Sequence, residues 1–445
     1  MIFLSPSQIL KKLYLIYFVL FIIFGIVGIT LMPPIQNVVI EIYLWIFSFL
    51  FCYQLYKSRP NAITVAIFLF QVISMMLITW INIEYYKEPY GFGADDALYY
   101  RSFGEDYGTR DFTSFAAVLY LLNDIDDFGY PTIVWLCYKA SYEYGSWLVI
   151  VLNAIVIALG SGRLYQIALR FLPHNYSKLV MVLWGFSVFA TTTACEGLKE
   201  NFMVFVIINY FYYLLQFQDK ASIKNTVLTV LFILLTFCFR LATGYSVILC
   251  FLATSILKLK FVRNKIKMLS LIGVGAAVVF LPTVLVLLAG QRGMDSDVFA
   301  TQSAEKSEAG GGFVVYVMNI ISSLIGPFPC FVSKDPEKLN YITRYSLLPT
   351  IKMVISFFFY YSLFEIYKKK ITTMFPMAIF VLINILMLII AFFGLHVRFQ
   401  WPHMPFFFIM SIWGYIKFID NRGKRKLYVG YLLFVFALIF LYNIR

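Results

Sequence analysis

The stretch KSRPNAITVAIFLFQVISMMLITWIN, from Lys57 to Asn82, is the clearest indicator of the fold class of this chain. Two basic residues and a proline precede an uncharged, largely apolar run over residues 62–82. A helix needs about 20 apolar residues to cross about 30 Å of hydrocarbon. Short loops rich in Lys and Arg stay on the cytoplasmic side of a membrane. The stretch therefore predicts a membrane-spanning helix that starts at the cytoplasmic surface.

Similar apolar runs recur through all 445 residues, of which 61% are hydrophobic and 13% charged. No long polar region separates the runs, so we expect one transmembrane domain over 1–445 and no separate soluble domain. The formal net charge of +13 is carried by short loops, as membrane topology requires, and does not indicate nucleic acid as a partner. The six cysteines are scattered singly, without the C-x-x-C spacing of zinc or redox sites.

We expect an all-α polytopic membrane protein with about thirteen spans, located in a bacterial inner membrane with a cytoplasmic N-terminus. The first apolar run lacks a small-residue cleavage site, which favours a retained span over a removed signal peptide. The predicted spans lie near residues 13–32, 38–56, 62–82, 146–169, 178–195, 199–217, 224–240, 243–258, 268–289, 346–366, 372–393, 400–417 and 427–443.

The basic loops that begin at Lys57, Lys258 and Lys417, and the loop that ends at Lys370, fall on the predicted cytoplasmic side. A further apolar segment, 313–331, contains Pro-Phe-Pro and is predicted to be a broken, re-entrant or interfacial helix. Counting this segment as a span would move the Lys370 loop to the outer side.

The acidic residues give a second signal of sidedness. Only Asp219, Glu365 and Asp420 fall on the inner side, and the other acids face outward. Two outer regions are large, 83–145 and 290–345. Three short outer segments also carry charges at span ends: EGLKEN (Glu196–Asn201), FRLATGY (Phe239–Tyr245) and HVRFQWPHMP (His396–Pro405). The outer face is therefore where we expect chemistry or recognition.

Within the first large loop, GADDALYYRSF places Asp95 and Asp96 side by side, followed by Tyr99 and Tyr100. One interpretation is a solvated loop in which an acid caps a short helix. The motif also resembles the first-loop acidic motif of GT-C superfamily glycosyltransferases, a family that includes protein mannosyltransferases and lipid A aminoarabinose transferases. In that family an acid pair followed by Tyr lies on a juxtamembrane helix in a large outer loop.

Two later segments extend the resemblance. Residues 126–169, from DDFGYP to an Asn-bearing span, are similar to the family's proline-marked amphipathic helix. HVRFQWPHMPFFFIM is similar to the family's arginine-aromatic entry to a late span, with Arg398, Phe399, Pro402 and Pro405 in register. The acidic loop follows the third predicted span here, whereas it usually follows the first span in the family.

The resemblance implies an inverting transfer of sugar from a polyprenyl-phosphate donor to a glycan, lipid or protein acceptor at the outer leaflet. Such a transfer needs a carboxylate base for the acceptor hydroxyl and cations for the departing phosphate. We predict Asp95 as the base, with Asp96 as the alternative. The predicted phosphate-binding cations are Arg240, Arg292, Arg344, Arg398 and Lys199. Each of these cations is alternatively an interfacial side chain that contacts ordinary lipid headgroups.

Glu196 and Glu200 would share a face if one helix ran through both. They are interpreted either as the capped start of a helix or as groups that bind the acceptor or orient Lys199. Tyr99, Tyr100 and His396 are further candidates to support the acceptor. We expect no bound metal or other cofactor, with a divalent cation at Asp95 and Asp96 left open.

Two other function classes compete. A polysaccharide polymerase of the O-antigen or capsule type acts on polyprenyl-diphosphate glycans and would shift the chemistry from Asp95 to the arginines. A lipid or glycan transporter predicts mid-span charges and internal repeats, and no repeat is evident.

Overall fold

The computed structural model describes residues 4–31, 57–87, 95–108, 128–141, 144–219, 222–258, 312–331, 346–391, 393–419 and 425–444. Every regular element within these ranges is a helix, which confirms the all-α prediction for this part of the chain. The α-helices are α1 (Pro6–Leu31), α3 (Pro60–Tyr86), α4 (Asp95–Gly108), α6 (Gly129–Ser141), α7 (Gly145–Ala168), α8 (His174–Gly185), α9 (Val188–Cys195), α10 (Glu200–Asp219), α11 (Ile223–Phe239), α12 (Leu241–Lys258), α15 (Gly312–Ile325), α17 (Leu347–Lys369), α18 (Phe375–Ile390), α19 (Val397–Gln400), α20 (Met404–Ile419) and α21 (Arg425–Ile444). Two short 3-10 helices are η5 (Thr372–Met374) and η6 (Trp401–His403).

Six helical stretches in the described residues are long and apolar enough to cross a membrane: Pro60–Glu84, Gly145–Ala168, His174–Cys195, Leu347–Lys369, Thr372–Ile390 and Arg425–Ile444. The chain is therefore a helical membrane protein, and the count of about thirteen spans stays a prediction. The predicted spans 38–56 and 268–289 lie outside the described residues.

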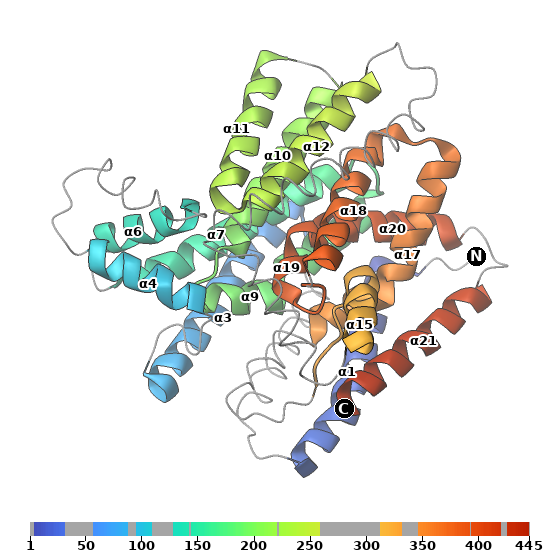
Figure 1. Ribbon diagram of the computed structural model, residues 1–445, viewed down its shortest axis with the longest axis horizontal. Coiled ribbons are helices and arrows are strands. Elements are labelled where there is room, and N and C mark those ends of the chain that lie inside the picture. The colour runs from blue at the N-terminus through green and yellow to red at the C-terminus, as the bar shows by residue number, and fades with distance from the viewer. Residues whose placement is uncertain are drawn as a thin grey trace.

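The helices divide into packed groups that meet at α10 and α20. On one side α10, α11 and α12 pack together, and on the other α17 packs along α20 (Figure 1). The short helices α4 and α6 pack on each other and lie at the edge of the molecule, where α6 also contacts α7 (Figure 1). A glycine allows the close approach of α17 and α20, because a Cβ at Gly414 would collide with the carbonyl oxygen of Phe358.

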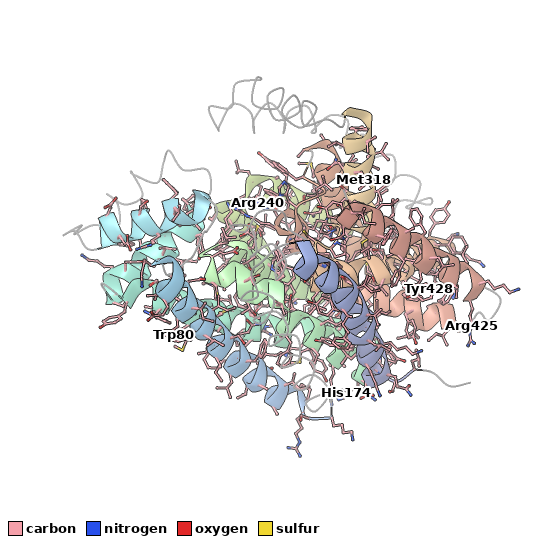
Figure 2. The ribbon with its side chains drawn as sticks, turned by 90° about the horizontal axis from the view of Figure 1, so that it is seen from below. Trp80, His174, Arg240, Met318, Arg425 and Tyr428 are labelled. Carbon is pink, nitrogen blue, oxygen red and sulfur yellow. The ribbon has the colours of Figure 1, made fainter. Side chains whose placement is uncertain are left out.

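Polar contacts gather at one end of the molecule, among segments that the topology assigns to the cytoplasmic side. Tyr176 Oη donates to the Leu4 carbonyl at 3.0 Å, and Lys178 Nζ donates to the Ser58 carbonyl at 2.7 Å. In Figure 2, His174 of α8 lies near the lower edge of the molecule and Arg240 near the upper edge. The assignment of these two ends to the cytoplasmic and outer sides of a membrane stays a prediction.

Three helix interruptions shape the site region. The predicted span 178–195 is broken at Phe186 and Ser187, between α8 and α9. Helix α9 ends at Cys195, and Gly197 adopts a positive φ of 66° before α10 begins at Glu200. No helix therefore runs through Glu196 and Glu200, and the condition for their sharing a helical face is not met. Helix α15 ends at Ile325, directly before Gly326 and Pro327, because proline cannot continue a helix.

Candidate functional site

Two arginines from distant parts of the chain converge on one buried glutamate. Arg398 Nε donates to Glu200 Oε1 at 2.5 Å, and Arg240 Nη2 donates to the same oxygen at 3.3 Å. The Glu200 side chain is 0% exposed, whereas those of Arg240 and Arg398 are 14% and 17% exposed. We call these three residues the arginine–glutamate cluster.

Each member of the cluster lies at a break between helices. Glu200 is the first residue of α10, and Arg240 occupies the extended link between α11 and α12. Arg398 is in α19, the short helix that follows the turn after α18. The three junctions were predicted to lie on the same, outer side of the membrane, and the structure brings them together at one place.

An aromatic ring orders both guanidinium groups. The ring centre of Phe399 lies 5.0 Å from the Arg240 guanidinium carbon and 5.7 Å from that of Arg398. Phe399 is itself stacked on Phe393, with 4.3 Å between ring centres. Cation–π contact and the shared carboxylate together restrict the orientation of two otherwise long, flexible side chains.

The cluster has an excess of positive charge, because two arginines share one carboxylate. A guanidinium presents five N–H donors in a planar fork that matches phosphate oxygens. The contact with Glu200 uses one donor of Arg240, and the side chain keeps partial exposure. The arrangement is suited to bind an anion at the exposed edge of the arginines, while Glu200 holds them from the buried side.

The N-terminus of α10 is held by a buried amide next to the glutamate. Asn201 Nδ2 donates to the Ala190 carbonyl at 2.9 Å, and Asn201 Oδ1 accepts from Trp401 Nε1 at 3.3 Å. Trp401 follows α19 and stacks on Trp184, with 4.1 Å between ring centres. These contacts connect the segment that carries Arg398 directly to the segment that carries Glu200.

Two more candidates lie in the turn before α10. Lys199 is buried and is close enough to Glu200 to interact with its charge, which adds a further positive group to the cluster. Glu196 is also buried and caps the end of α9. These two residues therefore belong to the same region as the arginine–glutamate cluster.

The acid pair opens helix α4, which begins at Asp95, and the juxtamembrane position of this helix stays a prediction. The side chains of Asp95 and Asp96 lie outside the described residues. Tyr100, one turn after Asp96, is buried and packs edge-on against Tyr130 of α6 at 5.1 Å between ring centres. Tyr99 is exposed.

An aromatic path leads from α4 toward the cluster. Tyr130 contacts Phe202 of α10, with 5.7 Å between ring centres, and Phe202 is two residues after Glu200 in the same helix. The helix that carries the acid pair is thus connected to the N-terminus of α10 through Tyr100 and Tyr130.

The candidates Arg292, Arg344 and His396 remain. Arg292 and Arg344 lie outside the described residues. His396 is exposed and packs edge-on against Phe399, with 6.0 Å between ring centres, on the same turn that leads to Arg398.

The sequence-based prediction missed the buried cation Lys352. Lys352, in α17, is 1% exposed, and its Nζ donates to Gln400 Oε1 and lies 3.4 Å from His403 Nε2. The signal that could have found it was a lysine inside the predicted span 346–366, because ionisable residues within spans are rare and usually functional.

Among the described residues, no group of three His, Cys, Asp or Glu side chains is arranged to hold a metal ion. Comparison with models of known protein families, with curated protein sequences and with solved structures finds no significant match. The functional argument therefore rests on the geometry of the site.

Proposed function

We propose that this protein is a membrane glycosyltransferase that moves a sugar from a polyprenyl-phosphate-linked donor at the outer leaflet to an acceptor hydroxyl. The observation that carries the proposal is the convergence of Arg240 and Arg398 on the buried Glu200. Their excess positive charge suits the negative charge that builds on a departing lipid phosphate.

In this proposal the two arginines bind the phosphate, and Glu200 fixes their orientation without contacting the substrate. A buried carboxylate that already pairs with two cations is a poor proton acceptor, because those cations favour its charged form. The base is therefore assigned to Asp95, with Asp96 as the alternative, at the start of α4. The contact of Tyr100 with Tyr130 supports this assignment by connecting α4 to the glutamate region.

A second candidate function is a polysaccharide polymerase that acts on polyprenyl-diphosphate-linked glycans. The same convergence of arginines favours it, because in that class the arginines rather than Asp95 carry the chemistry. A transporter has less support, since the charges of the cluster lie at helix ends.

Substitutions at two positions separate the candidates. Asp95→Asn keeps size and polarity and removes the basic carboxylate, so in the transferase it lowers turnover by about 10²-fold or more. Binding of the polyprenyl phosphate changes little in this variant. Arg398→Ala weakens that binding, and Arg398→Lys restores it only in part, because lysine lacks the planar fork.

Turnover is measured with membranes that contain labelled polyprenyl-linked sugar, and binding is measured on the purified protein in detergent. Arg170→Ala is the matched control, because Arg170 also pairs with an acid, Asp219 at 2.7 Å, but belongs to the predicted cytoplasmic side. If Asp95→Asn folds and keeps wild-type turnover while the arginine variants are inactive, the transferase is excluded and the polymerase is supported. Unchanged binding and turnover in Arg398→Ala would exclude both.

A further inference from the structure

Lys352 is a buried cation without an acidic partner among the described residues. Its Nζ donates to Gln400 Oε1, lies 3.4 Å from His403 Nε2 and lies 5.2 Å from the ring centre of Phe407. None of these three partners is negatively charged. A lysine inside a span is costly to bury, so such a residue is expected to have a specific role.

The contact with Gln400 extends into a network that reaches three segments. Gln400 Nε2 donates to the Ser322 carbonyl at 3.1 Å and to the Gly394 carbonyl at 2.6 Å. Lysine from α17, serine from the end of α15 and the glycine turn after α18 are thus joined through one amide side chain. We call Lys352, Gln400, Asn319, Ser322 and Gly394 the lysine bracket.

A second layer of hydrogen bonds holds the glycine turn. Ser322 Oγ donates to the Gly394 carbonyl at 2.6 Å, and the Gly394 amide donates to Asn319 Oδ1 at 2.9 Å. A Cβ on Gly394 would collide with Ser323 Oγ and the Asn319 carbonyl. The turn that leads into α19 is therefore pressed directly against α15.

Gln400 and Arg398 are two residues apart in the short helix α19, so their side chains point to nearly opposite sides. The Gln400 side chain faces the lysine bracket, whereas the Arg398 side chain meets Glu200. The position of α19 is thus set from one side by the bracket and determines the arginine contact on the other side.

We propose that Lys352 and Gln400 are positioning residues for Arg398, which hold α19 where the guanidinium meets Glu200. The role in phosphate binding rests on the proposed function, whereas the positioning itself does not. Two readouts, one without a ligand and one with a ligand, therefore separate the two ideas.

The first readout is a double-mutant cycle on the equilibrium unfolding of the full chain in mixed micelles. Lys352→Met and Arg398→Gln should be coupled. Loss of the lysine contact weakens the pairing of Arg398 with Glu200, and Arg398→Gln removes the same ion pair. We expect the combined effect on the unfolding equilibrium constant to differ from the product of the single effects by roughly tenfold, whereas independent sites agree to about twofold.

Lys178→Met is the matched control, since Lys178 is also buried and donates to a backbone carbonyl, that of Ser58, in the other polar region. The effects of Lys178→Met and Arg398→Gln on the unfolding equilibrium constant should multiply, as expected of independent sites. If Lys352→Met does not fold, Ser322→Ala removes one bracket hydrogen bond and takes its place in the cycle. A multiplicative result for the bracket variant overturns the positioning role.

The second readout is binding of farnesyl phosphate to the purified protein. Lys352→Met should weaken binding by about tenfold when Arg398 is present and should have no further effect in Arg398→Gln, the difference expected of two coupled residues. An undiminished effect in Arg398→Gln would mean that Lys352 acts independently of Arg398 and would overturn the inference. If the wild type does not bind farnesyl phosphate, the proposed function fails, and the unfolding cycle alone decides the positioning role.

Discussion

The arginine–glutamate cluster and the lysine bracket lie on opposite sides of the same short helix but satisfy their charges in different ways. In the cluster, cations that keep 14% and 17% exposure share a carboxylate that is 0% exposed. In the bracket, a lysine that is 1% exposed is held by Gln400, next to His403. The partly exposed arginines of the cluster can reach a ligand, whereas the hydrogen bonds of the buried lysine to uncharged partners fix the backbone.

The largest effect should come from Glu200→Gln, which removes the carboxylate of the arginine–glutamate cluster. Arg240 and Arg398, both mostly buried, lose the carboxylate that they share, and breaking a buried pair in this way costs about 3 kcal/mol or more. The free energy of unfolding in mixed micelles measures the loss. Asp219→Asn removes a carboxylate that is 65% exposed and paired with Arg170, so it should cost no more than about 1 kcal/mol. Equal losses in the two variants would show that burial does not distinguish the two ion pairs.

An intermediate effect is expected for Gly394→Ala, which tests the lysine bracket. The added methyl group would collide with Ser323 Oγ and the Asn319 carbonyl, and overpacking of this kind costs about 1–3 kcal/mol. A Cβ on Gly430 of α21 would have no neighbouring atom within 4 Å, so Gly430→Ala should instead stabilise the helix by up to about 1 kcal/mol. Thermal unfolding of the two variants checks the opposite signs. A stable Gly394→Ala protein would contradict the close contact between the turn and α15.

The smallest effect should come from Phe399→Leu, which separates the aromatic contribution to the cluster from the ionic one. It removes the ring shared by the Arg240 and Arg398 guanidiniums while leaving both ion pairs, at a cost of about 1 kcal/mol. Phe364→Leu is the control, because Phe364 is exposed and its ring lies 5.9 Å from the Lys368 ammonium. The same unfolding assay compares the two, and a larger loss at Phe364 would remove the ordering role of Phe399.

Parts of the site were predictable because they depend on local chemistry. Arg240 and Arg398 stand out as single cations at the ends of apolar runs, and Glu200 as an acid at the start of another run. Their meeting at one oxygen was not predictable, since it depends on how three helix junctions far apart in the chain pack together. Lys352 was recognisable as a lysine inside a predicted span, whereas its partners Gln400 and His403 were not predictable, because they lie in other helices.

Local sequence patterns were sufficient to establish the class of this protein. Apolar runs of membrane length predict helices, because a backbone in lipid must satisfy its own hydrogen bonds, and the all-α character follows from that requirement. The proline after α15 likewise ended a helix through a purely local effect. Packing in three dimensions was needed to show that Arg240 and Arg398 both reach the buried carboxylate of Glu200. Those outcomes depend on contacts between residues distant in sequence, which no local pattern of hydrophobicity or charge encodes.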